Sequence, residues 1–523
     1  MAGQINLILK NKLYAGILLA ALFLCALGLT AHVSLGDEVH HYRFAKDDYR
    51  IGGRASFDSI YGSGEKPGFY YTTEPLWSLG LSWFWHLTGG VFFTAAQIYQ
   101  TLFYILLLIA ASGFAGRRYD CETSLWSAVF LASVPMVATF GMLFYLDVPS
   151  AALTMLSLWL LELSQYPAAG LVLAAGIVTK KSSMFFYPAF FLILAWRHRK
   201  DPVRGIIRSI FLFLPTLIVM IFDARWKINH LSLNAVNNQR SLWNGIIGMG
   251  HEIQSQALSR LFIPLQPSGT GDSVRDKINP LYAAEYAVSN FHNAIDLLKY
   301  FGAVICVLLI FYFLFRCFKK KDLILWLCTL SYLTGIFLFH LLPDVRYFLP
   351  IAPFLAIFCA KAFISLPKNT WIKSGVVFLC VVQFLAVSFY TRQQRAVAPA
   401  LQEGFAYIEK NVPKDAVLLY PETNIIEFTD RQMVWSLSPL RAIFWGSNYE
   451  KLKALDYAKV GYIVIKKKRV YNDHTAATFH TGAYPQSFIE DLPRMPFLER
   501  IFDNSEMSLW KIKWEKINAG QAV

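Results

Sequence analysis

Apolar runs of about 15 to 22 residues recur along most of this chain, separated by short charged breaks. A helix needs about 20 apolar residues to cross the hydrocarbon core of a bilayer, so the repetition predicts a polytopic α-helical membrane protein. Only 16% of the 523 residues are charged, whereas a soluble domain has roughly 25%. The runs predict eleven transmembrane helices, over 13–33, 93–116, 124–145, 149–165, 168–181, 183–196, 206–222, 298–315, 323–341, 347–364 and 374–391.

The formal net charge is +14, which raises the question of a nucleic-acid partner. Before residue 375, however, most basic residues lie in short clusters between apolar runs, the pattern of cytoplasmic loops. We therefore expect no nucleic-acid partner. The clusters share one side of the membrane if all eleven helices cross, which places the N-terminus in the cytoplasm: Lys10 with Lys12, Arg117 with Arg118, 197–200 with Arg204, Arg316 with 319–321, and Lys368 with Lys373.

This topology predicts two domains, a transmembrane domain over 1–391 and an outer, water-exposed domain over 392–523. The transmembrane domain has outer loops at 34–92 and 223–297, the first with an aromatic-rich interfacial helix over 77–85. From Arg392 onward charged residues become common. Alternating stretches at 416–420 and 461–465 predict strands, and amphipathic patterns at 399–411 and 448–458 predict helices, so we expect a small α/β domain.

Acidic residues lie at two points of the predicted outer boundary. Asp37 and Glu38 follow the first apolar run directly, and a carboxylate in a partly desolvated pocket can act as a general base; the alternative is an ordinary solvated loop entrance. Asp147 stands in a tight turn between two apolar runs, where a carboxylate needs a partner or a task. Its alternative role is the N-cap of the next helix, because Pro149 and Ser150 follow it.

His40 and His41 follow the first acidic pair. They either extend the site or bind a metal, but adjacent histidines without further spaced ligands favour a polar-loop role. The seven cysteines include no CxxC pair, so neither a disulfide framework nor a zinc site is indicated. His40 and His41 are therefore the only residues that keep a divalent metal site among the alternatives.

Basic residues lie at the same boundary, against the positive-inside pattern. Lys180 and Lys181 separate two unusually short apolar runs, and Arg346 follows the ninth predicted span. Such charges favour an anion nearby, such as a lipid phosphate. The alternatives are lysines that extend to the interface and a salt bridge between Arg346 and Asp344. Acids suit the deprotonation of an acceptor and cations suit a phosphate leaving group, so the combination points to transfer from a phosphorylated lipid.

The order of these features resembles the membrane glycosyltransferases of the GT-C fold. Within them it is most similar to the users of polyprenyl-phosphate sugars, including protein O-mannosyltransferases and lipid A aminoarabinose transferases; 37–41 and 145–150 also resemble the dolichyl-phosphate-glucose glucosyltransferases. The resemblance covers about 1–390, and the matching segments are 36–38, 73–76, Asp147, 178–182 and 346–350.

The resemblance implies an inverting transfer of a sugar from a polyprenyl-phosphate donor to an acceptor hydroxyl. It implies Asp37 as the general base, with Glu38 and Asp147 orienting the acceptor or the base. Lys180 and Arg346 would hold the donor phosphate. The remaining residues that it implicates are Lys181 and Tyr347 at the phosphate, and His40, His41, Glu74, His340 and Asp344 as further substrate contacts. Lys181 stands where the family often has glycine and Glu74 replaces the first proline of the entry motif, which leaves the choice of phosphate lysine and the acceptor channel open.

The resemblance implies no cofactor. The expected partners are the donor lipid, membrane lipids and an acceptor that is a glycan, a lipid or a protein. The last residues, 519–523, carry no retention signal, which favours a bacterial inner membrane with a periplasmic C-terminal domain over the endoplasmic reticulum. Three other functions stay open: a transferase that uses a lipid diphosphate, a secondary transporter, whose polar residues would lie near the midplane, and a non-catalytic scaffold.

Overall fold

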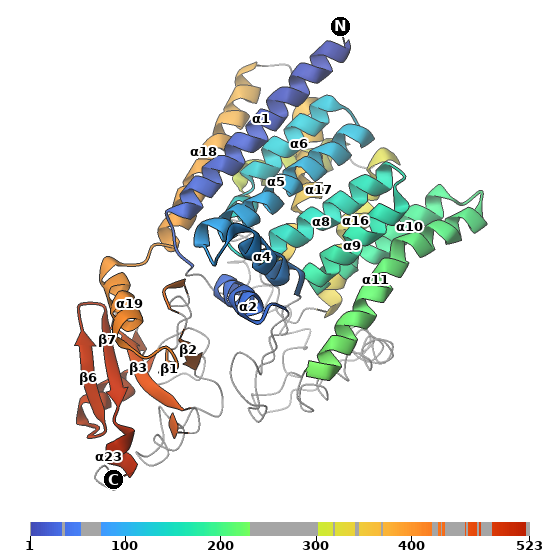
Figure 1. Cartoon of the computed structure of the whole chain (residues 1–523). Coiled ribbons are helices and arrows are strands. Elements are labelled where there is room, and N and C mark those ends of the chain that lie inside the picture. Colours follow the sequence, from blue (N-terminus) through green and yellow to red (C-terminus); the bar gives the residue numbers. More distant parts are fainter. Residues whose placement is uncertain are drawn as a thin grey trace, which may run out of the picture. The chain divides into compact units, whose positions relative to one another are not determined.

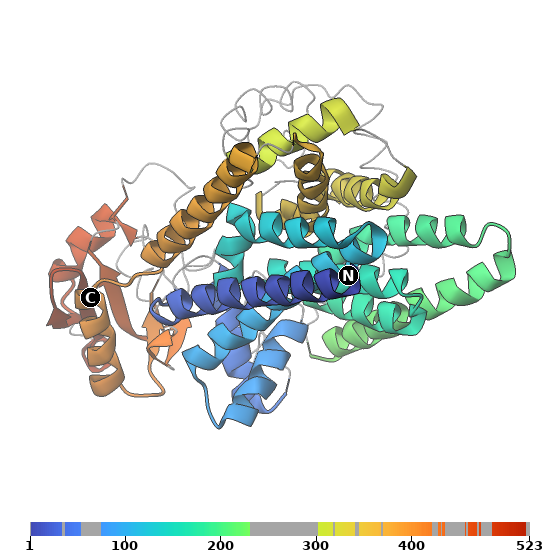
Figure 2. The ribbon, with the colours of Figure 1, turned by 90° about the horizontal axis from the view of Figure 1, so that it is seen from above.

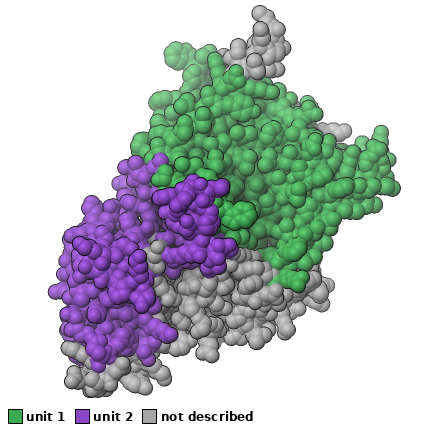
Figure 3. All heavy atoms as spheres, in the orientation of Figure 1, with its two compact units in different colours: residues 1–28, 74–84, 94–391 green, residues 29–73, 85–93, 392–523 purple. Residues whose placement is uncertain are grey.

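The computed structural model describes residues 2–33, 37–53, 75–230, 302–316, 320–339, 345–367, 370–420, 427–429, 431–434, 455–456, 459–467, 470–471 and 484–518. The chain divides into two compact units, which Figure 3 colours separately. The first unit takes in 1–28, 74–84 and 94–391, and the second takes in 29–73, 85–93 and 392–523. Most of the first predicted outer loop, 34–92, therefore belongs to the same unit as the segment after Arg392.

The first unit is helical (Figure 1). One continuous hydrophobic core runs through it, from Leu13 near the N-terminus to Cys380. Its elements, some of which run a few residues into the second unit, are α1 (Ala2–Leu29), α4 (Pro75–Thr88), α5 (Phe93–Arg118), α6 (Cys121–Ser133), α7 (Pro135–Met142), α8 (Asp147–Glu162), α9 (Tyr166–Thr179), η1 (Lys181–Phe186), α10 (Tyr187–Arg197), α11 (Pro202–His230), α15 (Ala303–Arg316), η3 (Lys320–Asp322), α16 (Leu323–Phe339), η4 (Val345–Ile351), α17 (Ala352–Ser365) and α18 (Thr370–Gln394).

Long apolar helices on the outside of this unit carry large exposed side chains. Leu19 of α1, Phe222 of α11 and Phe378 of α18 are 66–68% exposed, which suits a lipid environment and not water. Within the described residues, five helices are long and apolar enough to cross a membrane by length and composition, namely Lys10–Leu29, Phe93–Arg118, Pro202–Asp223, Arg346–Ser365 and Thr370–Gln394. The chain is thus a polytopic helical membrane protein, while the count of eleven spans stays a prediction.

The span predicted over 124–145 is corrected by the structure to two helices. The helix α6 ends at Ser133, α7 begins at Pro135, and the two are bent by 68°. Proline lacks the N–H that a continuing helix needs, and its ring clashes with the preceding turn. Pro135 therefore starts a new helix at its first position, where no donor is missed.

The packing of α8 on α9, and of α9 and α10 on α11, sets the positions of the ends of these helices. The helices α8 and α9 form an antiparallel hairpin, and α9 also packs on α11. Gly170 permits the second contact, because a Cβ there would overlap the backbone carbonyl oxygens of Phe211 and Leu212. In Figure 1 and Figure 2, α10 and α11 lie side by side and are joined by the short connection 198–201.

The second unit contains α2 (Asp37–Ile51) and a five-stranded sheet of order β2-β1-β3-β7-β6. The strand β1 pairs in parallel with β2 and β3, and β7 pairs antiparallel with β3 and β6. The predicted stretches 416–420 and 461–465 contain β1 and most of β3. The elements after Arg392 are α19 (Pro399–Asn411), β1 (Val417–Leu419), β2 (Gln432–Val434), β3 (Val460–Lys466), β4 (Val470–Tyr471), β5 (Tyr484–Pro485), α22 (Gln486–Asp491), η8 (Leu492–Arg494), β6 (Leu498–Asp503), β7 (Met507–Ile512) and α23 (Trp514–Asn518). Of the predicted helix at 448–458, the structure describes only 455–456.

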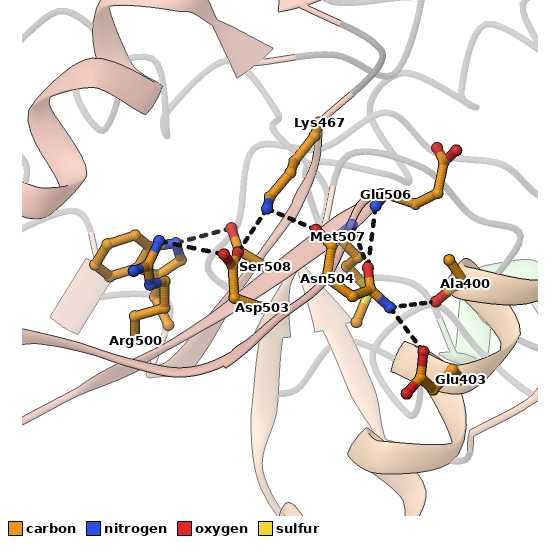
Figure 4. Close-up of polar contacts among 10 residues, drawn as sticks. Ala400, Glu403, Lys467, Arg500, Asp503, Asn504, Glu506, Met507 and Ser508 are labelled. Carbon is orange, nitrogen blue, oxygen red and sulfur yellow. Dashed lines mark hydrogen bonds and ion pairs between the residues drawn. The ribbon is translucent and has the colours of Figure 1, made fainter.

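Polar contacts at the turn between β6 and β7 hold α19 to the sheet (Figure 4). The Asn504 amide nitrogen donates to the carbonyl oxygen of Ala400 at 2.7 Å and to Glu403 at 3.3 Å. Its carbonyl oxygen accepts from the backbone N–H groups of Glu506 and Met507. One side chain thus accepts hydrogen bonds from two backbone N–H groups of the turn and also holds α19, the first helix after α18, to the sheet.

Candidate active site

Asp147 and Lys180 form an ion pair at one end of the α8–α9 hairpin. Asp147 is the first residue of α8 and Lys180 follows the last residue of α9, so the antiparallel packing brings them together. The Asp147 side chain is 2% exposed and that of Lys180 16% exposed. The alternative N-cap role of Asp147 is wrong, because the cap position is Leu146 and no side-chain capping bond forms.

A set of hydroxyl contacts fixes the break in the chain that carries Lys180. Lys180 has an extended backbone, and its N–H donates to the carbonyl oxygen of Gly176 at 2.9 Å as α9 ends. The Ser150 and Ser183 hydroxyls lie 2.5 Å apart, and Thr154 donates to Ser183 at 3.4 Å. These contacts tie η1 to α8, so Lys180 is held beside Asp147 by the helix ends and not only by its own flexible stem.

Arg346 and Tyr347 join this pair from η4, which packs on α8 and α16. The Lys180 ammonium lies 4.6 Å from the centroid of the Tyr347 ring. The guanidinium carbon of Arg346 lies 5.4 Å from the centroid of the same ring and 5.4 Å from that of Tyr145. Two cations and one carboxylate thus gather around aromatic faces, an arrangement suited to an anion of low charge.

Two buried hydroxyls border this cluster: that of Ser182, in the matching segment 178–182, and that of Tyr332, which the sequence alone did not single out. Tyr332 lies on α16, which packs on both η1 and η4. Its ring stacks on Phe186 with 4.7 Å between centroids. The hydroxyls of Tyr332 and Ser182 are buried and interact with each other, but within the described residues neither makes a hydrogen bond of good geometry. Buried polar groups of this kind are costly unless something satisfies them, so both are candidate ligand contacts.

The acidic pair of the first outer loop lies in the second unit, at the start of α2. Asp37 is the first residue of this helix, and its side chain and that of His40 lie outside the described residues. The Glu38 carboxylate is fully buried, 3.2 Å from the guanidinium of Arg395, which is also fully buried. Arg395 in turn donates to the carbonyl oxygen of His32 at 3.0 Å. Glu38 therefore anchors the start of α2 to the segment that follows α18.

The rest of α2 carries a second charged group. Asp47 lies 3.4 Å from Arg43 and 3.5 Å from Arg50. Burial raises the pKa of Asp47, against the opposing effect of Arg43, Arg50 and Lys46. His41 is half-buried on the same helix. The ion pairs of Asp47 stabilise α2 over its last turns.

The remaining predicted residues are placed only in part. Lys181 is half-buried and begins η1. Glu74, His340 and Asp344 lie outside the described residues, and so does the alternative pairing of Arg346 with Asp344. In the part of the chain that the structure describes, no group of three or more His, Cys, Asp or Glu side chains is arranged to hold a metal ion.

Two family models match the chain. Residues 74–226 match dolichyl-phosphate-mannose-protein mannosyltransferases, and residues 291–431 match the Alg9-like mannosyltransferase family. The first match contains Asp147 and Lys180, and the second contains Arg346. No curated protein matches the chain in sequence.

Solved structures with the same fold are distant in sequence. ArnT from Cupriavidus metallidurans bound to undecaprenyl phosphate has a TM-score of 0.60 at 11% identity, over 95% of this chain and 97% of ArnT. The oligosaccharyltransferase AglB from Archaeoglobus fulgidus, in complex with an inhibitory peptide and a dolichol-phosphate, has a TM-score of 0.52 at 11% identity, over 86% of this chain and 69% of AglB. The family matches and the fold together define a membrane glycosyltransferase. Its fold is GT-C, as the order of the sequence motifs predicted.

Proposed function

We propose that this protein is an inverting glycosyltransferase that moves a sugar from a polyprenyl-phosphate donor to an acceptor hydroxyl on the outer face of the membrane. The observation that carries the proposal is the meeting of Lys180, Arg346 and Tyr347 beside Asp147. The polyprenyl phosphates bound to ArnT and AglB in their structures support the same class of donor.

Lys180 and Arg346 hold the donor phosphate and stabilise the charge that grows on it as the bond to the sugar breaks. Asp147 positions Lys180, because their buried ion pair restricts where the ammonium can lie. An ammonium group has three N–H donors, so Lys180 keeps one on Asp147 and offers others to the phosphate. The ring of Tyr347 contacts both cations and sets their spacing.

Asp37 is the general base. The acceptor oxygen attacks the anomeric carbon, its proton passes to the Asp37 carboxylate, and the polyprenyl phosphate leaves from the opposite face, which inverts the configuration. Glu38 is a positioning residue, because its buried pair with Arg395 fixes the first turn of α2, where Asp37 lies. The donor's tail supplies affinity in the bilayer at about 0.8 kcal/mol per buried CH₂.

The topology proposed with this reaction has eleven spans, a cytoplasmic N-terminus, and a periplasmic domain over 392–523 in a bacterial inner membrane. A polyprenyl monophosphate carries less charge than a nucleotide diphosphate, so two cationic side chains suffice to neutralise it and no metal is required. The acceptor is a glycan, a lipid or a protein.

The experiment measures transfer of a labelled sugar by the full chain in nanodiscs, with the sugar on undecaprenyl monophosphate or on undecaprenyl diphosphate. We expect turnover of the monophosphate, loss of turnover in Asp37→Asn, and a raised donor KM in Arg346→Ala. Arg208→Ala is the matched control, because Arg208 also lies over a tyrosine ring, 4.6 Å from the centroid of Tyr166. Full activity of Asp37→Asn would show that Asp37 is not the general base. Turnover of the diphosphate donor alone would show that the donor is a lipid diphosphate and not a monophosphate.

A further inference from the structure

A cavity with basic side chains in its wall lies at the opposite end of α8 from the candidate site. Its volume is about 370 Å³, and its polar wall consists of Arg118, Arg197, Arg199 and Lys200. Arg118 ends α5 and Arg197 ends α10, while Arg199 and Lys200 lie in the connection to α11. The positive-inside pattern predicts this end of the bundle to be cytoplasmic.

The cavity has more positive charge than its carboxylate neutralises. Glu162, the last residue of α8, pairs with Arg197 and lies 3.8 Å from Arg118. Among the described residues, no carboxylate lies within ion-pair distance of Arg199 or Lys200. Four cationic side chains thus face one acid, and like charges held together in this way favour an anion between them.

An apolar groove of about 620 Å³ adjoins the cavity, and Arg199 lines both. The groove runs between α10 and α11 and is lined by Phe191, Ile206, Ile210 and Leu214, among others. These four side chains are 45–62% exposed, on helices whose apolar surfaces suit lipid. A basic cavity and an apolar groove that meet at one arginine are complementary to a phosphorylated lipid, whose headgroup is anionic and whose acyl chains are apolar.

This cavity is separate from the candidate active site. Asp147 begins α8 and Glu162 ends it, and a helix of 16 residues is roughly 24 Å long. The length of α8 therefore keeps a phosphate at Arg199 far from Lys180, so one headgroup does not reach both.

We propose that this cavity binds the phosphate headgroup of an anionic phospholipid, with one acyl chain of the same molecule in the α10–α11 groove. The arginines fit phosphate oxygens in bidentate geometry, and the guanidinium carbon of Arg199 lies 4.8 Å from the centroid of the Trp196 ring, which holds the group in place. A lipid in this position links the α10–α11 hairpin to α5 and the start of α16. Because it binds the folded protein only, it stabilises the fold by mass action.

The test titrates the full chain in detergent with dioleoyl-phosphatidylglycerol and with dioleoyl-phosphatidylcholine, and follows binding and thermal unfolding. The variant is Arg199→Ala/Lys200→Ala, because Arg118 and Arg197 also hold Glu162 and their loss would disturb folding. Lys10→Ala/Lys12→Ala is the matched control, since both lysines are exposed and lie on the same predicted face. Each basic residue near an anionic lipid strengthens binding roughly fivefold, so the double variant is expected to bind phosphatidylglycerol about thirtyfold more weakly.

A second variant tests the groove. Ile210→Trp fills it from the exposed face of α11 and is expected to weaken the binding of phosphatidylglycerol while leaving the binding of glycerol phosphate unchanged. Equal binding of phosphatidylglycerol by the wild type and by Arg199→Ala/Lys200→Ala would overturn the proposal. So would full displacement of the lipid by inorganic phosphate at low concentration, which would assign the cavity to a free anion, or tighter binding of undecaprenyl phosphate, which would assign it to the donor.

Discussion

Replacing the Lys180–Asp147 pair one partner at a time separates its structural role from its proposed role in donor binding. Asp147 is 2% exposed and Lys180 16% exposed. Removing one partner of a buried pair leaves a charge without its counterion and costs about 3–5 kcal/mol. We expect Lys180→Met alone to lower the free energy of unfolding by about 3 kcal/mol, the lower end of that range because Lys180 is partly exposed. The double variant Lys180→Met/Asp147→Asn is expected to recover most of this loss.

Transfer activity is not expected to follow stability. Without Lys180 the leaving phosphate loses one preorganised cation, and the loss of one such group lowers the rate about 10²–10³-fold. The double variant should therefore be stable and still inactive. The assay is kcat and KM for sugar transfer in nanodiscs, measured beside thermal unfolding. Recovery of activity together with stability in the double variant would refute the phosphate role of Lys180, because the lysine would then serve only to hold Asp147.

The chain offers a matched control pair in Lys361 and Asp322. Asp322 is fully buried and Lys361 is 15% exposed, and the Lys361 ammonium lies 4.6 Å from the centroid of the Tyr119 ring. Lys361 follows Arg346 by 15 residues along η4 and α17, which places it roughly 20 Å away. The same substitutions there should reproduce the stability pattern and leave transfer unchanged.

Three further outcomes are expected. Glu38→Gln should lower thermal stability, because it leaves the fully buried Arg395 without this counterion, and Glu38→Gln/Arg395→Met should restore the stability; no change in Tm for Glu38→Gln would argue against the anchor. Chelation by EDTA should leave transfer unchanged, because cationic side chains neutralise the phosphate; an activity lost with EDTA and regained with Mg²⁺ or Mn²⁺ would contradict this. A cysteine introduced at Lys410, exposed at the end of α19, should react with an impermeant maleimide from the outer face, and labelling only from the cytoplasm would reverse the topology.

The candidate site could be predicted in part from the sequence, because charges at a membrane boundary are costly and therefore informative. Asp147, Lys180 and Arg346 stood out against apolar surroundings, and the structure brings them together. Tyr332 did not stand out, because a tyrosine within an apolar run is as common in a core as in a site. Its significance comes from α16 packing on both η1 and η4, which is tertiary information.

Three other differences have physical causes of different kinds. The bend at Pro135 was predictable, since a proline inside a helical run ends the helix, but the prediction of one span over 124–145 overlooked it. The pairing of Glu38 with Arg395 was not, because the two residues are far apart along the chain and only the fold joins them. The N-cap considered as an alternative at Asp147 followed from good local chemistry, but a lysine across the hairpin competes for the same carboxylate.

The charges of the cluster also fit the course of the proposed reaction. Lys180 and Arg346 each carry one positive charge and Asp147 carries one negative charge, so the three side chains together suit the single negative charge of a sugar phosphodiester. The polyprenyl monophosphate that leaves carries about −1.5 to −2 at pH 7. As this charge develops, the phosphate attracts the Lys180 ammonium more strongly than the Asp147 carboxylate attracts it. The interaction between Lys180 and the phosphate therefore grows from the donor complex to the transition state, which is the condition for catalysis. After transfer, Asp147 competes with the product phosphate for the same ammonium, and this competition favours release of the spent lipid.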